Sequence, residues 1–198
     1  DGFYKGGQQL NFIVNYSENV ILNTTAGIPS LNIVLDGVNR SAIYYSGTGS
    51  NSLIFRYTIV TGDLDLNGIA LGAHIVLNSA TIRDAGGNNA NLALNAVGST
   101  TNVLVDAVAP AIPASFTATA GNAKNSLTWL ENTENDIDSY KIYAGTANNP
   151  TTLLTTIPAP AITYHHNALL NGTTYYYRIS AVDKVGNESP LSVSVFAK

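Results

Sequence analysis

At 198 residues the chain is long enough for one large domain or for two ordinary domains of about 100 residues each. A hydrophobic fraction of 45% with only 11% charged residues excludes a disordered chain. The net charge of −4 combines four basic and seven acidic residues up to Asp106 with five basic and six acidic residues after it. This balance argues against binding to nucleic acid or to an anionic membrane surface.

The chain contains no cysteine, which excludes disulfides and thiolate metal sites and favours a bacterial over an animal origin for a secreted β-protein. No apolar run approaches the roughly 18 residues that a membrane-spanning helix needs, so we expect no membrane insertion of this segment. Asp1–Lys5 lacks the basic start and apolar core of a signal peptide, and the chain has no methionine. These features indicate a fragment or a processed chain.

Alternation of apolar and polar residues is the dominant pattern in the first half. Leu53, Phe55 and Tyr57 form its clearest inward face, and Asp36-Gly37 marks a tight turn. The pattern predicts short strands near residues 10–16, 31–35, 41–45, 53–59, 73–77, 92–94 and 103–105. Around seven short strands without a helix predict a β-sandwich.

Several ordered motifs carry a family resemblance across residues 1–106: DGFYKGGQQLNFIVNYSENV, then YYSGTGSNSLIFRYTIVTGDLDLNGIAL, ATIRDAGGNNANLAL and VLVDAVAP. They resemble the Ig-like or cadherin-like repeats that occur in tandem in large bacterial surface and adhesin proteins. The resemblance implies an extender domain, in a family of which some members bind calcium at or near the junctions between repeats.

The segment from Asp63 to Ile69 is the main candidate for chemistry. Asp63, Asp65 and Asn67 place oxygen side chains at alternate positions before Gly68, and the Ile69 carbonyl would add a ligand. This spacing suits a calcium loop, with ligand distances of about 2.3–2.6 Å. The twelfth position holds a histidine instead of the glutamate of an EF-hand, and no helices flank the segment. A polar turn is the alternative interpretation.

Three further acids are candidates to complete a calcium site: Glu18 after a strand, Asp84 at a turn, and Asp106 before the prolines. Converging carboxylates would require a cation. The resemblance puts the acidic residue before the proline linker near the next domain, so Asp106 is the candidate for a junction ligand. Taken singly, each acid also fits a solvated surface charge.

A proline-containing stretch divides the chain. Pro110 and Pro113 lie among small apolar residues and cannot sit inside a regular sheet, because proline lacks the N–H that a strand donates. We therefore predict a first domain over 1–106, a linker over 107–112 and a second domain over 113–198.

The second half again alternates. Leu127 and Trp129 form one inward face, and Tyr175, Tyr177 and Ile179 form another. Strands are expected near residues 116–119, 125–129, 137–144, 151–157, 161–164, 175–182 and 191–195. The prediction for the whole chain is therefore all-β, with two tandem β-sandwich domains.

This half closely resembles a bacterial fibronectin type III domain over its whole length, especially in the segment SAVDKVGNESPLS. The resemblance implies that Trp129 is the buried core tryptophan. It also implies a tyrosine corner at Leu169 and Tyr175, whose phenol bonds backbone a few residues upstream. Asn171 stands where the family often has proline, and Asn-Gly serves the same turn.

Other polar and aromatic residues of the second half have structural explanations. His165 and His166 are adjacent on a strand and point to opposite faces, so they are not expected to share a metal. Outward tyrosines such as Tyr143 and Tyr176 fit sugar stacking as well as ordinary surface exposure.

No motif predicts catalysis. The chain has no G-x-S-x-G elbow, phosphate loop, H-E-x-x-H pair or thiol nucleophile. We expect a non-catalytic spacer or stalk of a secreted or surface-anchored bacterial protein, adhesion-related and stiffened by calcium. Its partners would be neighbouring domains of the same chain and a glycan or surface protein. The alternative is a carbohydrate- or protein-binding accessory region of an extracellular polysaccharide-acting enzyme.

Overall fold

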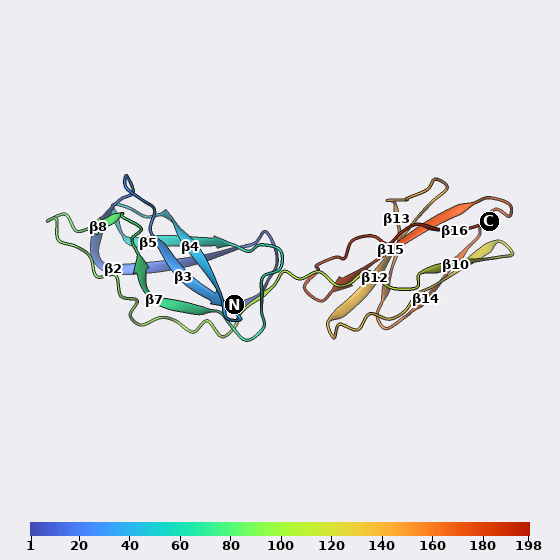
Figure 1. The fold of residues 1–198 in the computed structure, drawn as a ribbon, viewed down its shortest axis with the longest axis horizontal. Coiled ribbons are helices and arrows are strands. Elements are labelled where there is room, and N and C mark those ends of the chain that lie inside the picture. Colours follow the sequence, from blue (N-terminus) through green and yellow to red (C-terminus); the bar gives the residue numbers. More distant parts are fainter. The chain divides into compact units, whose positions relative to one another are not determined.

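The computed structural model describes all 198 residues and contains strands and turns but no helix (Figure 1). The all-β prediction is thus confirmed. The structure therefore has no helix that could cross a membrane. The chain forms two compact units, Asp1–Val108 and Ala109–Lys198.

Unit 1 is built from two sheets. The larger has six strands in the order β7-β3-β4-β5-β2-β8 and the smaller three in the order β1-β9-β6. The nine strands are β1 (Gly2–Tyr4), β2 (Gln9–Asn23), β3 (Ser30–Leu35), β4 (Val38–Ser46), β5 (Ser50–Thr58), β6 (Leu64–Asp65), β7 (Ala70–Val76), β8 (Thr81–Arg83) and β9 (Val103–Asp106). All pairs are antiparallel except β1 with β9, which is parallel.

The core of unit 1 follows the predicted alternation. Leu53 and Phe55 of β5 and Ile33 of β3 are fully buried, and Val105 of β9 joins the same cluster from the smaller sheet. Burying one such side chain stabilises the fold by about 1.5–3 kcal/mol. The Asp36-Gly37 turn between β3 and β4 has positive φ at both residues, 42° and 81°, as a tight hairpin turn requires.

Two strand predictions in unit 1 need correction. Leu64 and Asp65 are not in a loop but form β6, because they pair with Asp106 and Val105 of β9. Residues 92–94 are not a regular strand. Only Ala93 forms an isolated bridge, and two backbone hydrogen bonds attach this segment to β7.

Unit 2 also has two sheets, with strand orders β10-β11-β14 and β13-β12-β15-β16. The strands are β10 (Thr117–Gly121), β11 (Lys124–Thr128), β12 (Ile137–Gly145), β13 (Leu153–Pro158), β14 (Thr163–Asn167), β15 (Tyr175–Asp183) and β16 (Val195–Ala197). Trp129 is 3% exposed and packs edge-on against Phe116 and Tyr140, at centroid distances of 6.4 and 5.3 Å.

The end of the chain departs from simple alternation. Val193 is 84% exposed, whereas Ser192 is buried. The Ser192 hydroxyl accepts a hydrogen bond from the Ile179 amide, and the Ser189 hydroxyl accepts one from the Ala181 amide. The amides of Ser189 and Ser192 donate in return to the carbonyls of Ala181 and Ile179. These two residues, through side chain and backbone together, thereby take the place of a regular strand along this part of β15, and the final strand is reduced to β16.

Hydrogen bonds hold both ends of the stretch between the units. Ala107 donates to the Asp63 carbonyl and accepts from the Gly62 amide. The Ala111 amide donates to Glu134 at 2.6 Å, and the Asn132 amide group donates to the Ala111 carbonyl at 2.8 Å. The bond from Ala111 holds the pKa of Glu134 below its usual value. Only residues 108–110 lie between these two attachments.

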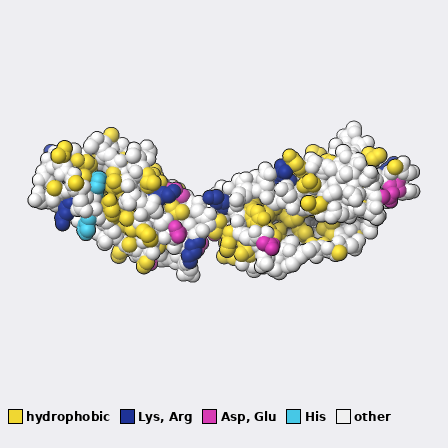
Figure 2. Space-filling model, turned by 180° about the vertical axis from the view of Figure 1, so that it is seen from behind, with side chains coloured by type: hydrophobic (Ala, Val, Ile, Leu, Met, Phe, Trp, Pro, Cys, Tyr) yellow, Lys and Arg dark blue, Asp and Glu magenta, His cyan; other side chains and the backbone are white.

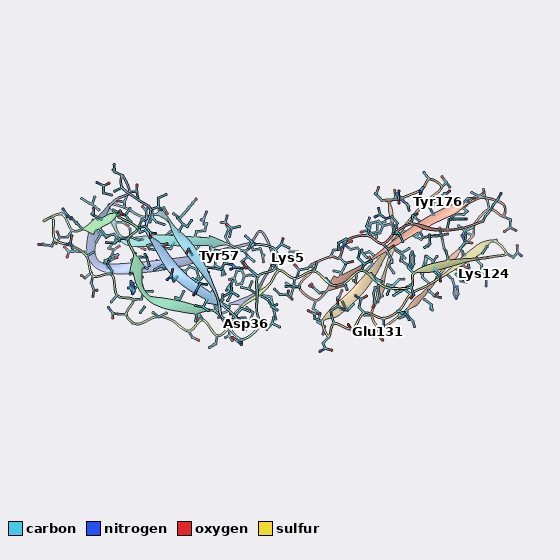
Figure 3. The ribbon with its side chains drawn as sticks, in the orientation of Figure 1. Lys5, Asp36, Tyr57, Lys124, Glu131 and Tyr176 are labelled. Carbon is cyan, nitrogen blue, oxygen red and sulfur yellow. The ribbon has the colours of Figure 1, made fainter.

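We expect Glu134→Ala to release residue 111 from unit 2, because the variant removes the acceptor of the Ala111 amide. Exchange of that amide with solvent, followed by NMR, should accelerate about tenfold. Glu131→Ala, at an exposed acid of the same loop (labelled in Figure 3), is the matched control and should leave the rate unchanged. Equal rates in both variants would contradict this attachment.

Candidate functional site

Asp63 lies directly before β6 and is 1% exposed. Its Oδ1 accepts hydrogen bonds from Arg40 Nε at 2.9 Å and forms an ion pair with Nη2 at 2.8 Å. Its Oδ2 accepts from the Tyr57 hydroxyl at 2.5 Å and from the Val60 amide at 3.0 Å. Both oxygens of this predicted calcium ligand therefore bind groups of unit 1 itself.

Burial, followed by the Asp63 carboxylate, raises the pKa of Tyr57 to about 12. The phenol therefore stays protonated and donates to Asp63 across the physiological range. Asp63 also raises the pKa of Arg40 through their hydrogen bond. The three side chains form a charged cluster at the rim of the apolar core.

Asp65 is 1% exposed and joins two turns. Its Oδ2 accepts from the Asp36 amide at 2.9 Å, and its Oδ1 accepts from the Asn67 amide at 3.2 Å. Figure 3 labels Asp36 and Tyr57, which are the neighbours of Asp65 and Asp63 respectively. The Asn67 side chain is exposed, and the Ile69 carbonyl accepts a hydrogen bond from the Thr100 hydroxyl.

The other predicted ligands are spread over unit 1. Asp106 is the last residue of β9, and its carboxylate accepts a hydrogen bond from the Val108 amide at 3.1 Å. In the sheet, Asp106 pairs with Leu64 of β6. Asp84 follows β8 and accepts from the amide and the side chain of Asn88 at 2.8 and 2.7 Å. Glu18 does not follow the end of a strand, as predicted, but lies within the longer β2, where it is exposed.

The structure brings some of these residues to one end of unit 1. Asp65 and Asp106 belong to the β6–β9 ladder and Asp63 directly precedes it, whereas Asp84 follows β8 at the opposite end of β2 from Gln9 (Figure 1). Within unit 1 alone, no three Asp, Glu or His side chains bring their ligand atoms within 4.8 Å of one another. Calcium binding by this set stays a prediction.

The partners of Asp63 were missed in the sequence. Arg40 lies two residues before the fully buried Ala42 in β4, and Tyr57 lies two residues after Phe55 in β5. Each pair points to the same face of the sheet. An arginine that is partly buried on the inward face of a strand favours an acidic partner, because an unpaired charge loses solvation there. The inward position of Arg40 in the alternation was therefore the signal in the sequence that could have predicted an acidic partner.

Unit 2 contains a second polar cluster that penetrates its core. The Tyr177 hydroxyl accepts from Asn125 Nδ2 at 2.9 Å and lies 3.0 Å from His166 Nδ1. His165, the adjacent residue on β14, instead contacts the Ser126 hydroxyl at 3.0 Å. The two histidines therefore have separate partners in different parts of unit 2.

Two carboxylates of unit 2 also act as structural acceptors. Asp183 Oδ1 accepts from the amides of Val185, Gly186 and Asn187 at 2.7–2.9 Å. Glu188 accepts from Lys141, Tyr143 and Ser180. Burial opposes ionisation of Glu188, but these donors outweigh it, so its pKa lies below the usual value.

Residues 110–198 match the family model of the fibronectin type III domain and form such a domain. Trp129 is buried in its core, and the Leu170 amide donates to the Tyr175 hydroxyl at 3.4 Å, which completes the predicted tyrosine corner.

Curated relatives match less than half of the chain. The chain is similar to an amylopullulanase of Thermoanaerobacterium saccharolyticum, 33% identical over 92 residues, and to an alpha-amylase of Niallia circulans, 35% identical over 94 residues. Each match covers 46% of this chain and 7% of the relative. The matched region is thus a small part of these relatives.

Among solved structures, the FN1-FN3 domains of chicken CNTN1 match 100% of this chain and 64% of theirs, with a TM-score of 0.52 and 14% identity. This likeness shows the β-sandwich fold alone. An Fn3-like protein of Clostridium thermocellum is 27% identical and covers 46% of this chain and 93% of its own, with a TM-score of 0.41.

We expect Asp63→Asn to lower the free energy of unfolding of unit 1 by about 2 kcal/mol, since it removes the charge that pairs with Arg40 and replaces one of the two acceptor oxygens by an NH2 group. Urea titration in EDTA measures this loss. Asp84→Asn, at a solvent-facing turn, should lower the free energy of unfolding much less.

Calcium titration of the same proteins tests the predicted metal site. If the Asp63–Ile69 segment binds calcium, calcium raises the melting temperature of the wild type, and Asp63→Asn loses that rise. An unchanged melting temperature of the wild type would exclude this site. A wild-type stability in EDTA equal to that of Asp63→Asn would contradict the structural role of the ion pair.

A pH effect follows from His166, whose pKa burial lowers below its usual value. As the pH falls, the histidine of the unfolded chain binds a proton at about pH 6.5, which is a higher pH than the folded protein requires. Unit 2 should therefore lose stability as the pH falls from about 6.5 towards the folded pKa. His166→Gln should flatten the slope of the unfolding free energy against pH below about pH 6.5. A slope in His166→Gln equal to that of the wild type would refute the assignment.

Proposed function

We propose that these residues are a non-catalytic spacer within an extracellular bacterial enzyme that acts on polysaccharide. The observation that carries this proposal is the similarity of the fibronectin type III region to parts of an amylopullulanase and an alpha-amylase, each of them far longer than this chain. A polysaccharide chain is too large to enter a cell intact, which supports an extracellular location.

The use of the carboxylates supports a spacer role. Glycoside hydrolysis needs two carboxyl groups about 5–9.5 Å apart and free to reach the sugar. Asp63, Asp65, Asp183 and Glu188 instead accept hydrogen bonds from their own domains. These acids serve to hold turns and strands together.

We further propose that unit 1 is an Ig-like or cadherin-like repeat. Its two-sheet sandwich, with β1 parallel to β9, supports this assignment together with the motifs of residues 1–106. In a surface-anchored adhesin the same pair of domains would act as a stalk, with neighbouring domains of the chain as partners.

A specific surface favours glycan binding as the second candidate function. Tyr176 of β15 and Phe196 of β16 are cross-strand neighbours with ring centroids 5.8 Å apart, and Phe196 is 64% exposed. Figure 3 labels Tyr176 on this sheet. Figure 2 shows the molecule from the opposite side, where charged side chains are sparse. Exposed aromatic rings can stack on sugars.

Two measurements on the 198-residue chain separate these functions. A spacer releases no reducing sugar from pullulan or soluble starch and does not cosediment with granular starch. Sugar release would contradict the non-catalytic proposal. Cosedimentation that Phe196→Ala reduces at least about tenfold, while the exposed Val193→Ala retains it, would replace the spacer by the glycan-binding role.

A further inference from the structure

Unit 1 contains a cavity of about 920 Å³ that the proposed function does not use. Residues 9–17 of β2 form one wall and residues 93–100 form another. Leu31 of β3 and Leu71 of β7 provide an apolar floor. A cavity of this volume lies within the range of ligand sites, about 300–1,000 Å³.

The lining shows that the cavity runs along the edge of β2. Successive side chains of a strand point to opposite faces, so a cavity against one face would be lined by alternate residues. Here all nine consecutive residues from Gln9 to Ser17 line it. At about 3.3 Å per residue, this edge is about 30 Å long.

That edge has no partner strand. β2 pairs with β5 through residues 9–15, and β8 pairs only with residues 21–23 at the far end. No backbone hydrogen bond joins residues 9–17 to the opposite wall, where residues 92–94 bond to β7 instead. In unit 2, by contrast, Ser189 and Ser192 close the corresponding edge of β15.

The alternation of hydrogen-bonding direction along β2 identifies which backbone groups face the cavity. The Ile59 amide donates to the Gln8 carbonyl, so the carbonyl of Gln8 points towards the β5 side of β2. Residues of an antiparallel strand alternate in the side to which they direct N–H and C=O. Asn11, Ile13 and Asn15 therefore direct theirs to the cavity.

The side chains of the cavity define the chemistry of an occupant. Phe12, Val14 and Tyr16 are partly buried and line it, and the buried Tyr16 hydroxyl has no hydrogen-bond partner. Asp1 is the only Asp, Glu, Lys, Arg or His of the lining. A row of free backbone groups above an apolar, nearly uncharged floor suits a strand without charges and with apolar side chains at alternate positions.

We propose that this cavity binds an extended, uncharged polypeptide strand, which adds to the edge of β2. Backbone hydrogen bonds to Asn11, Ile13 and Asn15 supply affinity, and the apolar floor selects alternate apolar side chains. An oligosaccharide would find hydroxyl partners in the asparagine side chains but would not need the regular spacing of the strand edge.

The probe is a nine-residue peptide of alternating threonine and valine with both ends blocked, added to the ¹⁵N-labelled 198-residue chain. We expect saturable NMR shifts along residues 9–17 and slower hydrogen exchange at the amides of Asn11, Ile13 and Asn15. The same peptide N-methylated at alternate residues keeps its side chains but loses backbone donors, and should bind at least about tenfold more weakly.

Ile13→Pro tests the protein side, because it removes a backbone donor from the open edge while Ile13→Val retains it. Ile13→Pro should lose peptide binding and keep the NMR spectrum of unit 2. If Ile13→Pro unfolds unit 1, the proposal is still tested by comparing how tightly the plain and the N-methylated peptide bind the wild-type protein.

Several results would overturn the proposal. One is equal affinity for the plain and N-methylated peptides, and another is no shift at 1 mM peptide, about the weakest binding such an assay detects. Shifts along residues 9–17 with maltoheptaose but not with peptide would make the cavity a glycan site. A concentration-dependent dimer in sedimentation, with the same three amides protected, would make a second copy the occupant.

Discussion

Every backbone N–H and C=O group of a sheet needs a hydrogen-bond partner, from the protein or from water, and this constraint determines most of what is distinctive in both units. Regular ladders meet it in the interior of the sheets. At the edges and turns, side chains meet it instead. Ser189 and Ser192 accept from β15, and Asp65 accepts from the turn between β3 and β4. The edge of β2 at residues 9–17 is where the chain supplies no such substitute.

The same constraint explains the carboxylates. A chain with few charges and many short turns has amide donors in excess at its turns, and a carboxylate can accept several of them at once. Asp183 accepts three amides of one turn, and Asp84 holds the Asn88 turn in the same way. Alternate aspartates therefore arise in such a chain for structural reasons as well as for metal binding.

The two units differ in how polar groups enter the core. In unit 1 the ion pair of Arg40 and Asp63 lies at the rim and keeps Tyr57 protonated. In unit 2 a cluster of Asn125, His166 and Tyr177 lies further in, and burial lowers the pKa of the histidine. Unit 1 therefore contains a charged pair, whereas burial in unit 2 favours the uncharged form of its histidine.

Much of this was determined by the sequence alone. Alternation along residues 53–57 and 175–181 predicts which side chains are buried, because the direction of a side chain in a strand depends only on its position. The all-β class, the buried Trp129 and the tyrosine corner at Tyr175 follow from local patterns and from the family resemblance. The tertiary structure decided which strands become neighbours. It made Leu64 and Asp65 a strand beside β9, turned Ser192 inwards, paired Asp63 with Arg40 and left β2 with an open edge. These features depend on contacts between residues far apart in the chain, and no local pattern contains the partner of a strand or of a charge.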